Sequence, residues 1–138
     1  MLVGLAVVGL TDATLLTKEH YSDLVLPCTV TRGCETVLTS KYSVVFGVPL
    51  ALFGIIFYFS VLVAALYLMA NLSKRLKQLI LLLGTIGFIS SLGLVYIQGA
   101  VLHAWCQYCL LSALTSTLIF ATSVALYRSK DKPKEEIT

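Results

Sequence analysis

The hydrophobic and polar positions of the chain divide it into long apolar runs separated by short polar stretches. Three runs are long enough to cross a membrane, since a spanning helix needs about 20 mostly apolar residues. They cover residues 44–70, 78–97 and 101–127, and none of them contains Asp, Glu, Lys or Arg. The last two are separated only by a short turn around residues 98–100, which predicts a helical hairpin.

A fourth apolar run, residues 1–16, is shorter than the others. A secretory signal peptide has a basic region before its apolar run and a small-residue cleavage site, and the sequence has neither feature, so we take this run as a first spanning helix. Asp12 lies near its outer end, and because a carboxyl group is costly in lipid, we expect it to face protein or water. The fold class predicted is therefore all-α, an integral membrane four-helix bundle.

The composition also indicates a membrane protein. Of 138 residues, 58% are hydrophobic and 12% are charged, whereas a soluble domain is about half apolar and roughly a quarter charged. This shortage of charge excludes a soluble enzyme, a disordered tail and a nucleic-acid binder. The length predicts one domain, residues 1–127, followed by a charged tail at residues 128–138.

The basic residues predict the orientation of the chain, since Lys and Arg collect in cytoplasmic loops. The loop at residues 71–77 and the tail are rich in them: Lys74, Arg75, Lys77, Arg128, Lys130, Lys132 and Lys134. The loop at residues 17–43 has fewer basic residues, and acidic residues balance them. We therefore expect the tail and the loop at residues 71–77 in the cytoplasm, and the loop at residues 17–43 outside.

Small residues predict where the helices touch, because they let backbones approach closely in a membrane. Gly84, Gly87 and Ser91 share one face of the third span. Hydroxyl side chains form a mildly polar stripe on the last span, at Ser112, Thr115, Ser116 and Ser123. We expect both sets to serve helix packing.

Four cysteines supply the candidate chemistry, and the predicted topology brings all of them to one side of the membrane. Cys28 and Cys34 fall in the outer loop, while Cys106 and Cys109 fall at the outer end of the last span. This is the oxidising side, where disulfides persist. Cys106 and Cys109 form a Cys-x-x-Cys motif in the first turn of a helix, whose N-terminus stabilises a thiolate. Since Cys109 is one turn deeper, we expect Cys106 to be the solvent-exposed member.

The two cysteine pairs together predict a relay by thiol–disulfide exchange. Pro27 and Gly33 indicate an irregular segment around the loop pair, which would let this pair approach a fixed dithiol. Exchange moves two electrons as a unit through a mixed disulfide. A sealed relay of two disulfides turns over only once, so the electrons must leave it. We expect a quinone, a lipid-soluble two-electron acceptor, to receive them near Cys109.

Other interpretations of the cysteines stay open at this point. His103, Cys106 and Cys109 follow one another at intervals of three residues, and His and thiolate are ligands for zinc or copper. A metal site of this kind usually needs a fourth ligand. Two structural disulfides, in a helical scaffold protein without catalytic activity, would also explain the pairing.

The longest motif runs from Cys34 to Pro49 and follows the pattern Cys-x-x-Val-x-x-Ser-x-Tyr-x-x-x-Phe-Gly-x-Pro. The last span begins with Trp-Cys-x-x-Cys, and Gly9-Leu-Thr-Asp12 lies in the first apolar run. In this combination the chain resembles the vitamin K epoxide reductase family, in its bacterial quinone-dependent form. The resemblance extends over nearly the whole chain.

This resemblance implies a four-helix bundle around a quinone, ubiquinone or menaquinone, with an extracytoplasmic loop and a short half-helix between the first two spans. It implies that Cys109 lies next to the quinone and that Cys106 accepts electrons from the loop. Cys28 and Cys34 correspond to the shuttle pair that reacts with a thioredoxin-like partner. Only a short charged tail follows the last span, so we expect this thiol oxidase to be a separate protein.

The resemblance also implies quinone contacts and a substrate class. Ser40 corresponds to a serine in the half-helix that caps the quinone pocket, and Trp105 and Phe46 are further candidate contacts beside Cys109. No metal ion is implied. Animal members of the family have an aromatic residue at Ala113 and an asparagine at Leu50. These differences argue against vitamin K epoxide and favour quinone reduction coupled to disulfide formation, at the extracytoplasmic side of a bacterial inner membrane.

Overall fold

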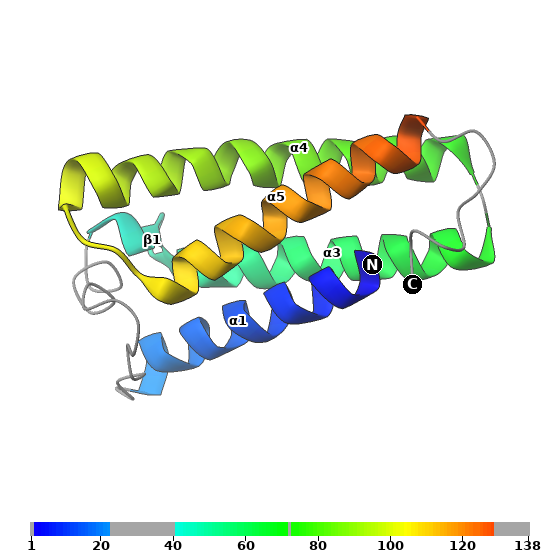
Figure 1. Ribbon diagram of the computed structural model, residues 1–138. Helices are drawn as coiled ribbons and strands as arrows, with labels where there is room; N and C mark the ends of the chain where they lie inside the picture. The colour runs from blue at the N-terminus through cyan, green and yellow to red at the C-terminus, as the bar shows by residue number, and fades with distance from the viewer. Residues whose placement is uncertain (1, 23–40, 72, 129–138) are drawn as a thin grey trace.

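The computed structural model describes residues 2–22, 41–71 and 73–128 of the chain (Figure 1). Four long helices make up most of this part: α1 (Leu2–Ser22), α3 (Leu50–Ala70), α4 (Lys74–Tyr96) and α5 (Gln107–Arg128). The shorter elements are a 3₁₀ turn (Lys41–Ser43), the strands β1 (Val44–Val45) and β2 (Val48–Pro49), and a π-helical turn (Ile97–Leu102) that continues α4. The prediction of an all-α bundle of four helices is confirmed.

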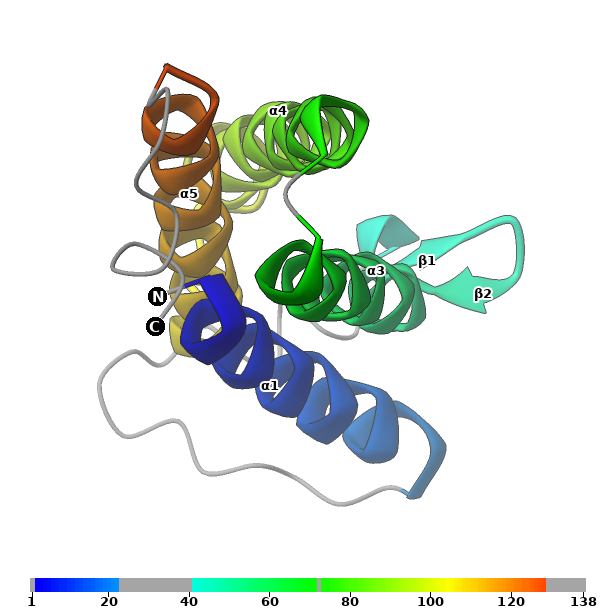
Figure 2. The same cartoon turned by 90° about the vertical axis from the view of Figure 1, so that its right-hand side faces the viewer.

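The four helices run alternately up and down and surround a common core (Figures 1 and 2). α1 packs mainly against α3 and also against α5, and α4 packs mainly against α5. The end of α1, the start of α3, the end of the π-helical turn and the start of α5 lie together at one end of the bundle (Figure 1). We call this the cysteine end, because Cys106 lies there. The opposite end, with Lys74 and Arg128, is called the basic end.

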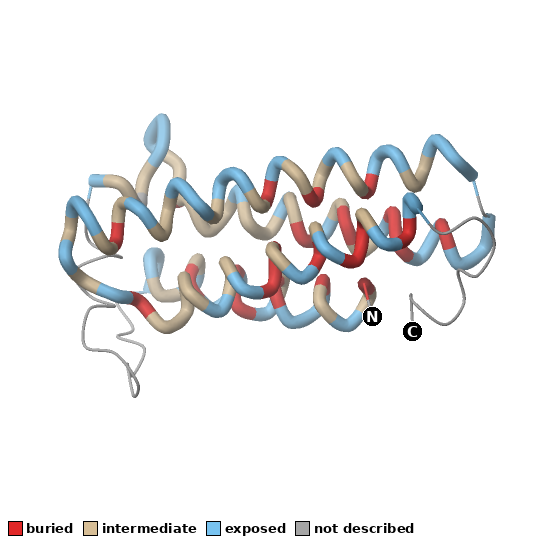
Figure 3. Tube along the Cα trace, turned by 45° about the horizontal axis from the view of Figure 1, so that its top comes forward, coloured by how far each residue is buried: buried red, intermediate tan, exposed pale blue. Residues whose placement is uncertain are grey.

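Within the part of the chain that the structure describes, three helical stretches are long and apolar enough to cross a membrane: Leu50–Ala70, Lys74–Leu102 and Gln107–Arg128. α1 has a similar length but contains Asp12, Lys18 and Glu19, and it is not among these three. Exposed positions cover the outside of the bundle (Figure 3), and many of them carry large apolar side chains such as Ile56 and Leu82. A bilayer would cover this outer surface, as expected for a membrane protein.

The second predicted span starts later than its apolar run, at Leu50 rather than at residue 44. Val44 and Val45 pair with Pro49 and Val48 in a small antiparallel hairpin. Phe46 and Gly47 form its two-residue turn with φ of 53° and 79°, the positive values that tight hairpin turns require. Pro49 has no N–H group and is extended, with ψ of 135°, so the helix begins at the next residue.

The connection between the last two spans also differs from the prediction. A turn was expected at residues 98–100 and a helix from residue 101, but the π-helical turn continues to Leu102 and α5 begins at Gln107. The continuous apolar character of this stretch hides the change of direction, because neither a charge nor a proline marks it. The first helix is longer than its apolar run and ends at Ser22 rather than at residue 16.

The basic residues expected in a loop lie at the start of a helix instead. Lys74, Arg75 and Lys77 belong to the first turns of α4, where the helix dipole favours acidic residues. Their charges therefore do not stabilise the helix. Together with Arg128 they gather positive charge at the basic end, which is the pattern of a cytoplasmic membrane boundary.

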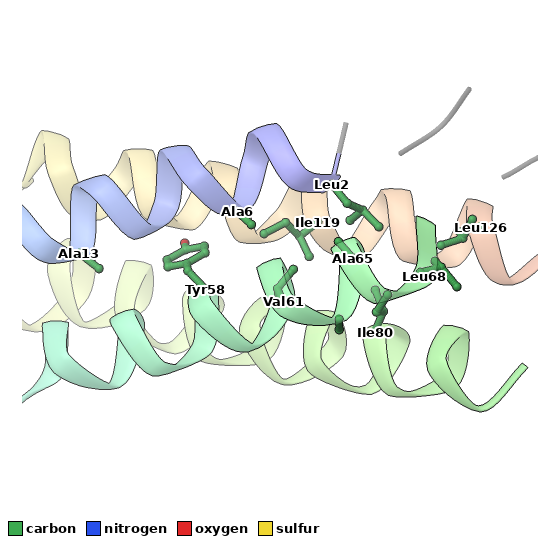
Figure 4. Packing of buried hydrophobic residues seen from close by; sticks show 11 residues of the cluster. Leu2, Ala6, Ala13, Tyr58, Val61, Ala65, Leu68, Ile80, Ile119 and Leu126 are labelled. Atoms are coloured by element: carbon green, nitrogen blue, oxygen red, sulfur yellow. The ribbon is translucent and has the colours of Figure 1, made fainter. Parts of the chain in front are cut away.

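Close helix contacts use the small residues that the sequence suggested. A Cβ atom on Gly84 would lie 3.1 Å from the backbone of Phe120 in α5, and one on Gly87 would lie 2.5 Å from the Phe57 ring in α3. The Ser91 and Ser116 hydroxyls hydrogen-bond each other between α4 and α5. Large apolar side chains fill the core toward the basic end: Leu2, Val61, Leu68, Ile80, Ile119 and Leu126 (Figure 4).

Candidate dithiol centre

The Cys-x-x-Cys motif lies at the start of α5, at the cysteine end of the bundle. The Leu110 N–H donates a hydrogen bond to the Cys106 carbonyl over 3.0 Å. Cys106 is therefore the N-cap residue of the helix, the last residue before the helical turns begin. Cys109 follows in the first turn, and both side chains are free thiols in this structure.

Cys106 is the more deeply buried of the two cysteines, so the expectation that it would be the solvent-exposed member is wrong. Its side chain is 0% exposed, whereas Cys109 is half-buried. That expectation considered only how far along the helix each cysteine lies. It could not include the connection from α4, which reaches the N-terminus of α5 and contacts Cys106 there.

Gln98 makes this contact, and no motif in the sequence predicts it. Its side-chain oxygen accepts a hydrogen bond from the Cys106 N–H over 2.9 Å. Its carbonyl oxygen accepts one from the Ala104 N–H over 3.0 Å. Gln98 is 2% exposed, and it lies in the π-helical turn, a feature that often marks functional sites in helices. A buried amide in an otherwise apolar run was the available signal.

The N-terminus of α5 favours a thiolate on Cys106. A hydrogen bond from the Cys109 side chain holds the pKa of the Cys106 thiol below its usual range, at about 7, against the opposing effect of burial. The backbone N–H groups of Tyr108 and Cys109 act in the same direction, as expected of unpaired N–H groups at a helix N-terminus. The thiolate of the reduced pair is therefore on Cys106, with the remaining S–H on Cys109.

Tyr58 of α3 lies one helical turn below the dithiol. Its hydroxyl group donates to the Ser112 carbonyl over 2.9 Å and lies 2.8 Å from the Ser112 hydroxyl. Ser112 comes one turn after Cys109 on α5. The ring points from α3 toward α1 (Figure 4), where a Cβ atom on Gly9 would lie 2.2 Å from it. The glycine thus makes room for the tyrosine.

Asp12 of α1 completes this group of buried polar side chains. It is 4% exposed, which fits the expectation that it faces protein. The residues that the structure describes offer neither of its carboxylate oxygens a hydrogen-bond partner. Asp12 acts electrostatically on Tyr58, Cys106 and Cys109. Side chains from α1, α3 and α5 therefore converge beside the two sulfurs.

The predicted quinone contacts lie in different parts of the structure. Trp105 packs against the π-helical turn, because a Cβ atom on Gly99 would lie 3.0 Å from its ring. Phe46 is 98% exposed at the tip of the hairpin, so the structure does not bring it together with the dithiol. Cys28, Cys34 and Ser40, with the half-helix expected around Ser40, lie outside the described residues.

The zinc or copper interpretation gains no support. Across residues 2–22, 41–71 and 73–128, no three His, Cys, Asp or Glu side chains gather as a metal site would require. His103 therefore does not join Cys106 and Cys109 in a ligand set. A groove of about 350 Å³ lies between Leu82 on α4 and Tyr127 on α5, toward the basic end and away from the cysteines.

Residues 1–124 match the vitamin K epoxide reductase family. The chain belongs to the vitamin K epoxide reductase family. No curated protein gives a significant match. Membership in the vitamin K epoxide reductase family makes the chain a multipass membrane oxidoreductase of the thiol–disulfide class that works with a quinone.

Polar side chains of the kind that a quinone site uses lie beside the dithiol. A quinone ring is flat and apolar and carries two carbonyl oxygens, so it needs apolar walls and a few polar groups near the reacting sulfurs. The Tyr58 hydroxyl and the unpartnered Asp12 carboxyl are polar groups of this kind. The match over residues 1–124 confirms the family resemblance expected from the cysteine motif and the Cys34 to Pro49 motif.

Proposed function

We propose that this protein is a thiol–quinone oxidoreductase that supports disulfide bond formation. It takes electrons from a separate thioredoxin-like thiol oxidase through Cys28 and Cys34, and passes them through Cys106 and Cys109 to ubiquinone or menaquinone. The observation that carries the proposal is the hydrogen-bonded Cys106–Cys109 dithiol at the N-terminus of a membrane-embedded helix. A thiolate stabilised there is a reactive sulfur rather than a packing residue.

Each step of the relay conserves atoms, electrons and protons. The reduced partner converts the Cys28–Cys34 disulfide to two thiols and is itself oxidised. A loop thiolate attacks the Cys106 sulfur, the Cys106–Cys109 bond breaks, and Cys109 leaves as a thiolate. The second loop cysteine displaces Cys106 from the mixed disulfide and re-forms the Cys28–Cys34 bond, and Cys109 takes up a proton, which leaves a Cys106 thiolate and a Cys109 thiol. Re-forming the Cys106–Cys109 bond sends two electrons to the quinone, which takes up two protons and leaves as hydroquinone.

Two features support this direction and place. Residues 23–40 connect Ser22 to Lys41, and both of these residues lie at the cysteine end (Figure 1), so the segment that contains Cys28 and Cys34 starts and finishes at the end of the bundle that holds Cys106. Lys74, Arg75 and Arg128 lie at the other end. By the positive-inside rule, the cysteine end faces away from the cytoplasm, on the extracytoplasmic side of a bacterial inner membrane.

Replacing Cys109 by alanine tests the centre itself. Quinone reduction driven by a reduced thioredoxin-like protein should fall to background in Cys109→Ala, because the electron-donating sulfur is gone. Leu111→Ala, exposed two residues further along α5, is the matched control and should keep wild-type activity. Wild-type turnover in Cys109→Ala would refute the assignment.

Replacing Cys28 by alanine tests the relay separately. Turnover with the protein thiol donor should stop, whereas a small dithiol such as dithiothreitol should still reduce the Cys106–Cys109 pair directly. An equal loss with both donors would contradict the relay and leave the dithiol centre in place. Assays with ubiquinone and menaquinone analogues, run side by side, identify the acceptor.

A further inference from the structure

Asp12 is the buried ionisable group that the relay described above does not use. Its carboxylate is 4% exposed, and neither oxygen has a hydrogen-bond partner among the described residues. A buried polar group without a partner lowers the stability of the fold, and more so if it is charged. Such a group is rare in a folded protein and calls for an explanation, often a catalytic role or a partner that is bound only in function.

The position of Asp12 brings it to the dithiol rather than to an arbitrary part of the core. It lies on the buried face of α1, one turn beyond Gly9, and Gly9 packs against the Tyr58 ring. The Tyr58 hydroxyl in turn bonds to Ser112, one turn after Cys109. Asp12 also acts electrostatically on both sulfurs. The packing of α1 on Tyr58 and the electrostatic effect on both sulfurs therefore place Asp12 on the side of the core that holds the reacting pair.

The chemistry of the pair leaves a proton to be removed. Starting from the Cys106 thiolate and the Cys109 thiol, formation of the S–S bond releases two electrons and one proton. Reduction of a quinone to hydroquinone takes up two electrons and two protons, so one proton comes from Cys109 and the second from solvent. Because Cys109 lies in the apolar stretch Gln107–Arg128, whose outer surface a bilayer would cover, its proton needs a base inside the bundle.

We propose that Asp12 is this base: it accepts the Cys109 proton, directly or through one water, and passes it toward the quinone. This inference rests on the proposed function. Within the described residues, the other titratable groups around the pair include Tyr58 on α3, whose hydroxyl is engaged by Ser112, and Glu19 on α1 itself, which acts on Cys109 from further along the helix. His103 and Tyr108 lie close to the cysteines in the chain, and neither is buried. Asp12 is the one among them that is both buried and unpartnered at both oxygens within the described residues.

The test compares Asp12→Asn, which keeps the shape and removes the acid, with Asp12→Glu, which keeps the acid. Thr14→Asn places the same amide on the exposed side of α1 and serves as the matched control. All variants carry serine at Cys28 and Cys34, so that only Cys106 and Cys109 react. The first readout is the single-turnover rate at which the reduced dithiol is oxidised by a short-chain ubiquinone or menaquinone, measured across pH.

The second readout needs no quinone. It is the ultraviolet absorbance of the Cys106 thiolate as pH is raised, and thermal unfolding of each variant checks the fold. Removing the negative charge of Asp12 should lower the pKa of the Cys106 thiol, since that charge opposes the thiolate. More thiolate should therefore form in Asp12→Asn than in wild type at the pH values where Asp12 is ionised.

Asp12→Asn should oxidise roughly 10²-fold more slowly than wild type and should lose the part of the pH dependence that reports the carboxyl group. Asp12→Glu should restore both, and Thr14→Asn should match wild type. An unchanged rate and pH profile in Asp12→Asn overturn the proposal. If the wild-type dithiol reduces neither quinone, the proposed function fails instead, and the thiolate titration then decides: no shift in Asp12→Asn overturns the role of Asp12.

Discussion

The two ends of the bundle bury different kinds of side chain. Toward the basic end, Leu2, Leu68 and Leu126 meet in a core of apolar side chains (Figure 4). At the cysteine end, the buried positions include polar or reactive groups: Asp12, Gln98, Cys106 and, one turn below, the Tyr58 hydroxyl. The two ends therefore have different roles. The basic end holds the helices together by packing, and the cysteine end holds the groups that can react.

The separation has a physical basis. Within lipid, helices associate through close packing rather than through a hydrophobic driving force, so an apolar core needs good shape more than chemical variety. Buried polar groups are expensive unless they are bonded. Gln98 and Tyr58 are bonded, whereas Asp12 is not bonded within the described residues. The unbonded group thus lies beside the reactive sulfurs rather than in the packed core.

The largest expected effect is on the stability of the apolar end. Leu68→Ala should lower the free energy of unfolding by about 2–5 kcal/mol, because Leu68 is fully buried and its loss leaves a cavity. The thiolate titration of Cys106 should not change. Leu66→Ala, on the exposed side of the same helix, should leave stability within about 0.5 kcal/mol of wild type. Unfolding by sodium dodecyl sulfate in mixed micelles measures both; a shifted titration in Leu68→Ala would show that the two ends are coupled.

Gly9→Ala should be the next largest effect. Its new Cβ atom would lie 2.2 Å from the Tyr58 ring, so the ring must move and its bond to Ser112 is strained or lost. We expect about 1–3 kcal/mol of destabilisation. Gly4→Ala is the control, since nothing lies within 4 Å of the added atom. It should be neutral or stabilising by up to about 1 kcal/mol. Equal effects of the two variants would contradict the close contact.

The pH dependence of the Cys106 thiolate tests the chemistry of the cysteine end. With a thiol pKa of about 7, half of Cys106 is thiolate at neutral pH, compared with a few per cent for an ordinary cysteine, a roughly 15-fold difference. Because the pKa is lowered, the thiolate should disappear only as pH falls below about 7. Ultraviolet titration in the Cys28→Ser, Cys34→Ser background measures it. Cys109→Ala should raise the midpoint, since it removes the hydrogen bond.

Gln98→Ala should have the smallest effect. It removes the acceptor of the Cys106 N–H, and the loss of one such hydrogen bond costs about 1 kcal/mol. Gln98→Glu keeps an acceptor at the same place, but burying its carboxylate should lower the stability further, and its added charge should raise the pKa of the Cys106 thiol. If Gln98→Ala changes neither the unfolding curve nor the titration, the contact does not position the motif.

Local features of the sequence predicted much of the fold and part of the site. Spans appear as uninterrupted apolar runs because lipid contact excludes charge residue by residue. Cys106 and Cys109 were assigned to a helix start from their spacing and flanking pattern, and the structure agrees. The boundary at residue 44 was wrong, since the hairpin before Leu50 is as apolar as the helix, and only its backbone geometry separates them.

The sequence by itself determined that this is a helical membrane protein with a Cys-x-x-Cys at a helix N-terminus, because hydropathy and spacing are properties of neighbouring residues. Only the tertiary structure decided that Cys106 is buried, that Gln98 bonds to its N–H group, and that Asp12 lies near the sulfurs. These residues come from α1, the π-helical turn and the start of α5. Their proximity depends on how helices distant in the chain pack, and no local pattern records that.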